Sequence, residues 1–447
     1  RPNSKGGLIL ANCTAVQCVI GGTTEGARNV ISGNAGSGLR FGNGASNWAV
    51  KKNFIGLNVA GDTAVPNGAD GIYITDSAAL VIGDSGHRNI ISGNIGRGIR
   101  IIDAIGAIGI SGNNIGTNPA GMVAIPNGMA GIYVQGGSAN ITIGAPDAIA
   151  PANIISGNLA SGFRVKNTLG GAVNFFSTID GLNADESGVI PNGQQGVKID
   201  GENGNLAVIT IGNTLTTGYN VIAGNASEVG VLSNIKIDDG SSATLRGNYI
   251  GTNSSGTFIP PHAGKDGLLI IGDNVAVGGT TVGQGNVFAG ASGNIESESV
   301  GQIAIRPQAA NTTVYGNFFG VDKNGDDLGV NANGVNNLGS GTIIGSAIDA
   351  GRNYFGNLGG IAIKLDSSTG ATLINNYIGV KPDGTAATTI SAEGITVEGS
   401  SINTVIGGPN GAARNVIGNV EGNGIYIGGA GVSGVDILNN YIGVGPD

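Results

Sequence analysis

One short sequence returns at regular intervals along this chain. The segment Asn-Val-Ile-Ser-Gly-Asn recurs in close variants, and successive copies start roughly 60 to 67 residues apart. The copies begin at Asn29, Asn89, Asn153 and Asn220, with weaker ones at Asn286, Asn353 and Asn415. A period of this length is typical of repeat architectures, in which each repeat buries its apolar face only by stacking on a neighbour. The chain is therefore expected to fold as a stacked array.

Two further motifs repeat in a fixed order with the first. One is Asn-aromatic-Ile-Gly, which begins at Asn53, Asn248, Asn317, Asn376 and Asn440, lacks its aromatic residue at Asn113, and is degenerate at 178–181. The other is Pro-Asn-Gly, a turn signal, at Pro66, Pro126 and Pro191. We expect a single continuous array over residues 1–447, with about seven modules of roughly 64 residues and no separate capping domain. These modules begin near Pro2, Pro66, Pro126, Pro191, Pro260, Asn331 and Ser391.

Between the motifs, apolar residues alternate with polar ones or glycine, as at 98–101 and 108–111. This period of two is a strand signal, and no stretch sustains the helical period. Glycine is abundant, at 86 of 447 residues, so the strands must be short and separated by many turns. The pattern predicts an all-β chain with almost no helix: a right-handed parallel β-helix, or β-solenoid. We expect about three coils of roughly 21 residues in each module.

The repeated asparagines are expected at the turns between strands. Asparagine tolerates the left-handed backbone conformation, and its side-chain amide can satisfy backbone groups. Stacked in register, such amides form hydrogen-bonded ladders. The residues assigned this structural role are Asn29, Asn34, Asn53, Asn89, Asn94, Asn113, Asn153, Asn158, Asn220, Asn225, Asn248, Asn317, Asn376 and Asn440.

These motifs resemble those of parallel β-helix repeat proteins of the pectin-lyase-like superfamily. More narrowly, the chain is similar to large bacterial secreted and surface proteins with tandem Asn-Val-Ile-Ser-Gly-Asn and Asn-Tyr-Ile-Gly-Thr modules. The resemblance spans essentially the whole chain and implies an extracellular or cell-surface location. It specifies fold more strongly than chemistry, because the superfamily includes lyases, hydrolases, phage tailspikes, adhesins and structural solenoids.

Charge and composition argue against two classes of partner. The formal net charge is −9, aromatic residues make up 4%, and no Lys/Arg cluster is visible along the sequence. Nucleic acid is therefore a poor partner, and highly acidic polysaccharide is disfavoured for the same electrostatic reason. No apolar run approaches the roughly 20 residues needed to span a bilayer.

We assign no catalytic residue from the sequence. The acidic pairs fall in predicted turns, as do His87 and His262, and the chain lacks the Gly-His-Gly and Arg-Ile-Lys segments of pectinase-like hydrolases. The alternative, a polysaccharide-active enzyme or tailspike-like depolymerase, would most readily use the irregular stretch 174–186, which includes Asp180, Asp185 and Glu186. Such an enzyme needs carboxylates on adjacent strands for acid and base chemistry.

Two local sites remain as candidates. Asp322, Asn324 and Asp326 offer oxygen ligands at alternate positions, as at the start of a calcium loop, but the Glu that closes an EF-hand is missing. Calcium is the one cofactor considered. Cys13 and Cys18 are the two cysteines, and a disulfide between them would require an oxidising compartment. The alternative is a pair of small apolar side chains without a bond.

Other residues recur at equivalent positions in the modules. The arginines before the first motif, Arg28, Arg88, Arg352 and Arg414, are interpreted as structural, capping turn carbonyls. Tyr73, Tyr133 and Tyr426 alternate with inward-facing residues and are expected to point outward. They are either ordinary surface residues of strands or a stripe that binds sugar.

The sequence as a whole favours an extracellular structural β-solenoid: a filament, stalk or adhesin shaft. Regular modules without a unique polar cluster support this prediction over the enzyme and over a second alternative, a glycan-binding module. The chain begins and ends in matching phases of the repeat. Either it is a section of a longer solenoid, or copies assemble head to tail, which would generate a fibre.

Overall fold

The structure, a computed structural model, describes residues 2–137, 139–150, 152–168, 170–201, 207–225, 233–260, 266–291, 301–329, 332–387 and 389–443. The chain forms two compact units. Unit 1 comprises residues 1–212 and 217–231, and unit 2 comprises 213–216 and 232–447. Of the expected module starts, Pro2, Pro66, Pro126 and Pro191 lie in unit 1 and Pro260 and Ser391 lie in unit 2. Asn331 and His262 lie outside the described residues.

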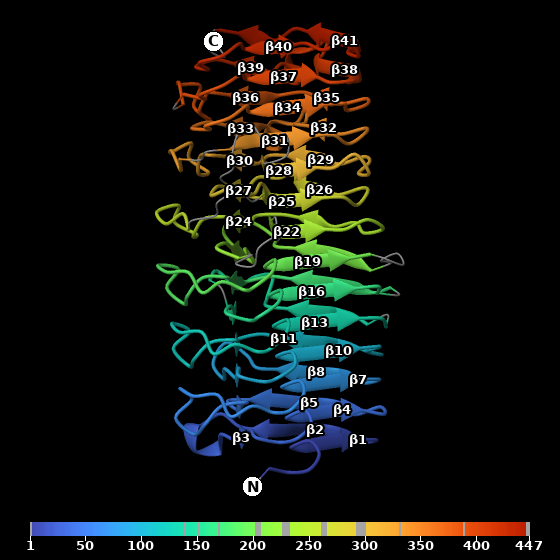
Figure 1. The fold of residues 1–447 in the computed structure, drawn as a ribbon, viewed down its shortest axis with the longest axis vertical. Coiled ribbons are helices and arrows are strands. Elements are labelled where there is room, and N and C mark those ends of the chain that lie inside the picture. Colours follow the sequence, from blue (N-terminus) through green and yellow to red (C-terminus); the bar gives the residue numbers. More distant parts are fainter. Residues whose placement is uncertain are drawn as a thin grey trace. The chain divides into compact units, whose positions relative to one another are not determined.

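Unit 1 is a parallel β-solenoid with three sheets, which confirms the fold class (Figure 1). Sheet 1 runs in hydrogen-bonded order β1 (Leu8–Ala11), β4 (Leu39–Gly42), β7 (Ile72–Thr75), β10 (Ile99–Ile102), β13 (Ile132–Gln135), β16 (Phe163–Lys166), β19 (Val197–Asp200). Sheet 2 runs β2 (Thr14–Gly21), β5 (Ser46–Lys51), β8 (Ala78–Ile82), β11 (Ile108–Ile110), β14 (Ile141–Ile143), β17 (Ala172–Phe175), β20 (Val208–Ile211). Sheet 3 runs β3 (Val30–Ile31), β6 (Phe54–Ile55), β9 (Ile90–Ile91), β12 (Asn114–Ile115), β15 (Asn153–Ile155), β18 (Thr178–Asp180), β21 (Val221–Ile222).

Unit 2 has the same three-sheet organisation. Its sheet 1 runs β22 (Ser233–Ile237), β25 (Asp266–Ile270), β28 (Gly301–Ile305), β31 (Asn333–Asn337), β34 (Ile363–Asp366), β37 (Ile395–Glu398), β40 (Ile425–Ile427). Sheet 2 runs β23 (Thr244–Leu245), β26 (Ala276–Gly278), β29 (Thr313–Tyr315), β32 (Ile343–Ile344), β35 (Thr372–Leu373), β38 (Ile402–Gly407), β41 (Ser433–Leu438). Sheet 3 runs β24 (Tyr249–Ile250), β27 (Val287–Phe288), β30 (Phe318–Phe319), β33 (Asn353–Phe355), β36 (Asn376–Ile378), β39 (Val416–Ile417), β42 (Tyr441–Ile442).

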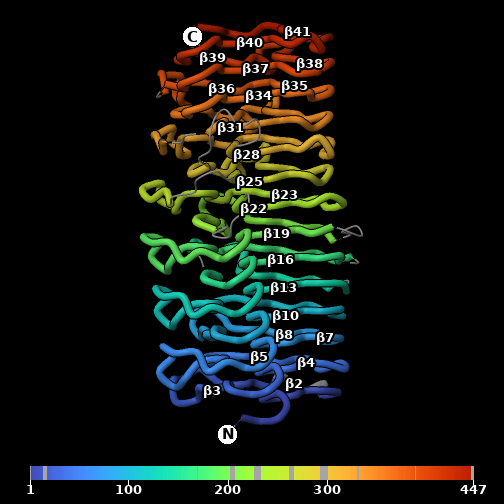
Figure 2. Tube along the Cα trace, in the orientation of Figure 1, coloured from blue at the N-terminus to red at the C-terminus, as the bar shows by residue number. Residues whose placement is uncertain are grey.

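Helix is nearly absent, as predicted. The helical segments of the described residues are three single turns of 3₁₀ helix: η1 (Glu25–Ala27), η2 (Asp349–Gly351) and η3 (Gly411–Ala413). In both units the chain winds repeatedly through the same three strand positions (Figure 2).

The expected number of coils per module is wrong. Leu8 pairs with Leu39 in the next coil, and Leu39 pairs with Ile72 in the coil after that, so one module makes two coils rather than three. The reason is that the first two motifs occupy one position in alternate coils, because Val30 of the first pairs with Phe54 of the second. Alternate coils are also lengthened by a loop after sheet 3, such as the one closed by the antiparallel bridge between Leu57 and Ala64.

The core of each unit consists of stacked apolar side chains from the inward positions of the strands. In sheet 1 of unit 1, Leu39, Ile72, Ile99 and Ile132 lie one above another and are fully buried. The residues between them in sequence face outward, because side chains alternate across a strand. Burial of each such aliphatic side chain contributes about 1.5 to 3 kcal/mol.

Two asparagine ladders also connect the coils of unit 1. The entry ladder, at the start of the sheet 3 strands, joins Asn29, Asn53, Asn89, Asn113 and Asn153 through side-chain amide hydrogen bonds of 2.9–3.4 Å. The exit ladder, after those strands, has bonds of 2.7–3.0 Å. It joins Asn3, Asn34, Asn67, Asn94, Asn127, Asn158, Asn192 and Asn225. The structure thus places the second asparagine of the first motif and the asparagine of Pro-Asn-Gly in one column.

Unit 2 keeps the entry ladder. Its amides are linked by bonds of 2.8–3.2 Å through Asn248, Asn286, Asn317, Asn353, Asn376, Asn415 and Asn440. The exit positions differ: the residues three places after Phe288, Phe355 and Ile417 are Ala291, Leu358 and Val420.

Candidate functional site

The outer face of sheet 3 in unit 2 carries a column of aromatic side chains. Phe318 pairs with Tyr354 in the next coil, and Tyr354 pairs with Tyr377 in the one after. The rings of Phe318 and Tyr354 are stacked, with centroids 5.3 Å apart and planes 10° apart. Tyr354 and Tyr377 meet edge to face at 5.7 Å. Because side chains alternate along a strand, Phe319 and Phe355 point inward instead and are buried.

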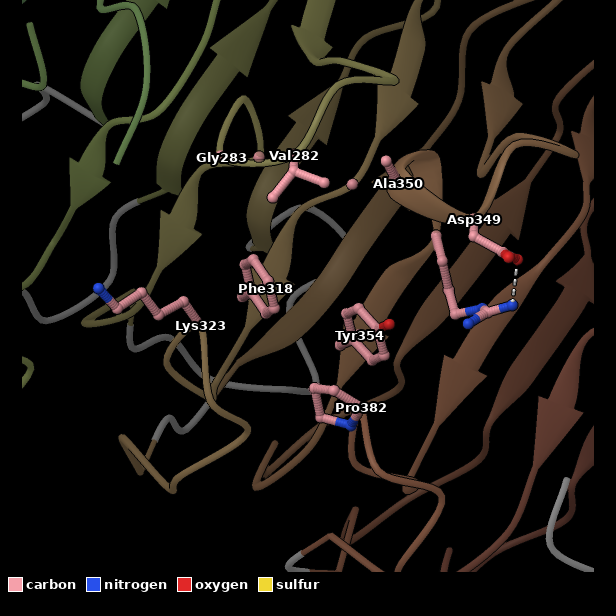
Figure 3. Close-up of a pocket in the computed structure, with 11 residues that line it drawn as sticks. Val282, Gly283, Phe318, Lys323, Asp349, Ala350, Tyr354 and Pro382 are labelled. Carbon is pink, nitrogen blue, oxygen red and sulfur yellow. Dashed lines mark hydrogen bonds and ion pairs between the residues drawn. The ribbon is translucent and has the colours of Figure 1, made fainter. Parts of the chain in front are cut away.

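A hollow of about 200 Å³ lies against this column (Figure 3). Phe318 and Tyr354 form its floor, Val282 and Ala350 lie at one side, and Pro382 lies at the other. The loops after β30 and β36, which include Lys323 and Pro382, form the wall. An apolar ring surface beside a few polar groups is the usual composition of a small-molecule site.

The charged groups of the hollow are held in place. Arg352 Nη2 forms an ion pair with Asp349 Oδ1 at 2.8 Å, and its Nε donates to Asn375 Oδ1 at 2.8 Å. The same guanidinium lies over the ring of Tyr377, 4.3 Å from its centroid. Lys323 lines this hollow and also a second one of about 240 Å³ beside Tyr249. The pair of hollows therefore offers aromatic surface beside two cations, Arg352 and Lys323.

The calcium candidate borders the second hollow, and its carboxylates serve the turn. Asp322 Oδ1 accepts from the backbone N–H groups of Asn324 and Asp326 at 2.8 and 2.9 Å. Asp322 Oδ2 accepts from the Asn324 side chain at 3.0 Å, and Lys381 lies 3.8 Å from Asp326. Asn58 holds the equivalent turn in unit 1 in the same way. The described residues contain no group of three or more His, Cys, Asp or Glu side chains suited to a metal, and calcium binding stays a prediction.

Asp180, the centre of the enzyme alternative, faces the interior rather than the surface. It pairs with Ile155 and Ile222, occupies the position of an inward isoleucine, and has no exposed surface. Its Oδ1 accepts from Asn192 of the exit ladder at 2.8 Å. Burial raises the pKa of Asp180 well above its usual value.

The other acidic residues of that stretch lie in a turn. Asp185 Oδ1 accepts from the backbone and hydroxyl of Ser187, and Glu186 has a left-handed backbone with φ of 59°. Asp180 therefore lies inside the core, whereas Asp185 and Glu186, its expected catalytic partners, lie in a turn. In unit 2, Asp266 is also buried, and burial raises its pKa to about 7 against opposing interactions with the Gly301 N–H and Arg306. Asp266 was not singled out in the sequence, although an Asp-Gly pair before an inward aliphatic residue also occurs at Asp70 in unit 1.

The recurring arginines contact the next coil, chiefly through aromatic rings. Arg28 lies over Phe54 at 4.1 Å and Arg414 over Tyr441 at 3.9 Å, as Arg352 does over Tyr377. Where the motif lacks its aromatic residue, Arg88 donates to the Asn114 side chain instead. The expected capping of a carbonyl occurs at Arg414, whose Nε donates to Asn439 O at 3.2 Å. The signal in the sequence was the arginine one coil before three of the aromatics, which are Phe54, Tyr377 and Tyr441.

The three tyrosines lie on sheet 1 strands, Tyr73 and Tyr133 in unit 1 and Tyr426 in unit 2. Tyr133 is only 6% exposed because Arg97 lies over its ring at 4.4 Å, so it offers little ring surface. Tyr426 is 45% exposed. Sugar binding by these residues stays a prediction.

The remaining candidates have local roles. Cys13 and Cys18 are free thiols, so the structure contains the unbonded alternative. His87 Nδ1 lies 2.6 Å from Asp84 Oδ1. Burial acts to raise the pKa of Asp84, but hydrogen bonds from Lys51, the Gly86 backbone and His87 outweigh it and lower the pKa to about 2. Within the described residues, no helix has the length and apolarity to cross a membrane.

Comparison with known proteins finds similarity to solved structures at low sequence identity. No protein-family model and no curated protein matches it. Among solved structures it is similar to the Dettilon tailspike protein (gp208), with 15% identity and a TM-score of 0.36 over 90% of this chain. The chain spans 60% of that tailspike. It is also similar to PfbA, a surface adhesin of Streptococcus pneumoniae, with 12% identity and a TM-score of 0.24 over 92% of this chain and 82% of the adhesin.

Proposed function

We propose that the chain is an extracellular structural β-solenoid: a filament, stalk or adhesin shaft. The observation that carries this proposal is the use of the repeated polar side chains. The asparagines bond to asparagines in neighbouring coils, and the arginines contact aromatic rings or oxygens in the next coil. The repeated asparagine and arginine side chains, which in another fold could mark a catalytic or binding motif, are thus used for contacts between coils.

The acidic residues support the same proposal. A glycosidase needs two carboxyl groups roughly 5 to 10 Å apart on either side of its substrate. Asp180 is enclosed in the core, while Asp185 and Asp322 hold turns. The structural roles of Asp180, Asp185 and Asp322 therefore account for these acids without catalysis.

A screen of bacterial and plant polysaccharides tests this proposal against the enzyme alternative. We expect no release of reducing ends or unsaturated sugars. Release that is lost in the conservative variant Asp180→Asn, while the variant remains folded, would overturn the proposal. Head-to-tail assembly also stays a prediction, and electron microscopy of the purified chain tests it: single particles at all concentrations would contradict it.

A second function, glycan binding, is favoured by the hollow beside Phe318 and Tyr354. A stacked aromatic floor with Lys323 at its rim can hold the apolar face of a sugar ring and donate to its hydroxyl groups. A glycan array identifies a ligand, and Tyr354→Ala should then weaken binding at least tenfold. Tyr426→Ala, which removes an exposed tyrosine from another sheet of the same unit, is the matched control. Equal losses in both variants would remove the hollow as the site.

A further inference from the structure

The middle of the outer face of sheet 2 in unit 1 is exposed and uncharged. One row of outward side chains runs from β2 to β17, one on each coil: Val19, Ala49, Val81, Gly109, Thr142 and Asn174. Beside this row, two positions earlier in sequence, lie the exposed residues Asn47, Ala79, Ala107 and Asn140. We call these ten residues the sheet 2 face. Its two valines project into solvent, since Val19 and Val81 are 50% and 46% exposed.

Gly109 leaves a gap in the row that its own chain does not require. It lies in the middle of β11, and its φ is not positive. A Cβ built on it would meet open space, with no described atom within 4 Å. Neither backbone conformation nor crowding within the chain therefore calls for glycine, although glycine weakens a strand. Glycine at such a place is typical of a close approach by a second backbone or a ligand.

Val81 is a projection that matches this gap. It pairs with Gly109 of the next coil, so the two lie side by side at the same position along their strands. A rotation of 180° about an axis parallel to the strands and between β8 and β11 brings Val81 of each of two copies over Gly109 of the other. The same rotation places Ala49 opposite Thr142. The face is therefore complementary to itself, as a two-fold symmetric interface requires.

The area of the sheet 2 face suits a weak but specific pair. Six coils at about 4.8 Å and strands about 16 Å long give a footprint of about 450 Å² on each copy, or roughly 1,000 Å² over both. This is close to the lower limit for a specific interface, so we expect a dissociation constant on the order of micromolar. Such a pair forms at concentrations that solution measurements reach.

The equivalent surfaces elsewhere lack this match. In unit 2, the same row of sheet 2 includes Thr313, Ile343 and Thr372 on successive coils and no glycine among its described residues. On sheet 1 of unit 1, the outward row carries the charged side chains of Arg40 and Arg100. The combination of projection, gap and missing charge thus belongs to one face of one unit.

We propose that two copies of the chain pair side by side through the sheet 2 face of unit 1, with their coils stacked in opposite directions. Apolar burial stabilises the pair, and the acids Asp76 and Asp103 lie in the turns before β8 and β11. Salt screens repulsion between such acids, so the pair should persist at high salt. This pairing uses the side of the solenoid, and it rests neither on the proposed function nor on head-to-tail assembly.

Sedimentation of the full chain at concentrations up to about 100 μM tests the proposal, and we expect a monomer–dimer equilibrium. Gly109→Val fills the gap with a residue that favours strands. It should leave the denaturant midpoint, read by Trp48 fluorescence, unchanged or higher, and it should weaken the dimer at least roughly tenfold. Thr313→Val, which adds a methyl group to the equivalent row in unit 2, is the matched control and should change dimerisation by less than about twofold.

A double variant exchanges the projection and the gap. Val81→Gly with Gly109→Val keeps the row complementary to itself and should restore dimerisation to within about threefold of the original chain. Monomers at every concentration, dissociation at high salt, equal dimerisation of Gly109→Val and the original chain, or a folded double variant that stays monomeric would overturn the proposal. Fibres that lengthen with concentration and are unaffected by Gly109→Val would indicate end-to-end contacts instead and would also overturn it.

Discussion

The two units fill the corner of the coil after the sheet 3 strands with different side chains. In unit 1, the corner inside each coil holds an asparagine whose amide bonds to the coils on both sides, as Asn94 does with Asn67 and Asn127. In unit 2, the equivalent positions hold Ala291 and Leu358, and the neighbouring inward residues are Phe288, Phe319 and Phe355. These rings stack at 5.1 and 4.5 Å.

The comparison shows that the coil backbone does not require the exit ladder. It requires that the corner be filled and that buried polar groups be paired. Gly71 in unit 1 illustrates the crowding, since a Cβ there would lie 2.8 Å from both the Asn94 amide and Ile91. In unit 2, a Cβ on Gly334 would lie 2.8 Å from Phe355 instead. Amide and ring thus fill equivalent space, and the glycine is retained in both.

The largest effect is expected where unit 2 depends on a ring. Phe319→Ala removes the middle of the three-ring stack and leaves a cavity that the fixed coils cannot close, so it should destabilise unit 2 by about 4 kcal/mol. Faster amide hydrogen exchange in β27, β30 and β33 measures the loss. Phe319→Leu, which keeps most of the volume, should cost about 1 to 2 kcal/mol. Equal exchange in both variants would mean that the stack does not fill the core.

Replacing the corner residue of one unit by the equivalent residue of the other should destabilise either unit. Asn94→Leu gives unit 1 the residue that unit 2 has at Leu358, but it removes one hydrogen bond each from the Asn67 amide, the Ile55 carbonyl and Asn127 Oδ1. We expect a cost of about 3 kcal/mol. Trp48, the only tryptophan, lies in unit 1 and reports its unfolding by fluorescence.

The reciprocal change is Leu358→Asn, which buries an amide beside aromatic rings. It should cost about 2 to 3 kcal/mol, read by hydrogen exchange in β33. A neutral result for either exchange would show that the ladder and the apolar filling are interchangeable, and the distinction between the units would lose its physical meaning.

Much of the fold could be predicted, because each repeated residue reports the same environment many times. The three motifs were enough to predict parallel coils with short strands and almost no helix. The number of coils per module was wrong because Asn29 and Asn53 belong to different motifs in sequence and to one column in space. Periodicity alone cannot show that two unlike motifs are equivalent, since register depends on loop length.

The candidate sites were less predictable, because they arise from contacts across coils. Val81 and Gly109 are neighbours in space but lie on different coils, so a search along the sequence passes over them. The hollow at Phe318 and Tyr354 depends in the same way on how loops fall against a sheet face. Asp180 showed a real irregularity, but the sequence did not show that this position points inward.

The stability of unit 1 should depend on pH through the buried side chain of Asp180. Its folded-state pKa is raised by burial above the unfolded value, so the neutral form contributes stability below about pH 4, and this contribution is lost as pH rises through the folded pKa. Asp180→Asn keeps a neutral polar side chain and should stabilise unit 1 at pH 8 by on the order of 1 to 2 kcal/mol. Denaturant midpoints by Trp48 fluorescence should fall with pH above 4 in the original chain and less steeply in the variant. Parallel pH profiles would show that the group titrates as if it were exposed.

The smallest effects should be the same in both units, because the arginine–aromatic contact is common to them. Double-mutant cycles of Arg28→Gln with Phe54→Leu in unit 1, and of Arg352→Gln with Tyr377→Leu in unit 2, isolate the two contacts. Each coupling energy should be about 0.5 to 1 kcal/mol, as expected for a cation over a ring at a partly exposed site. Fluorescence measures the first cycle and hydrogen exchange the second. A coupling present in one unit alone would mean that the surface contacts, like the interior ones, were selected separately in each unit, whereas equal couplings assign the difference between the units to the inside of the coil.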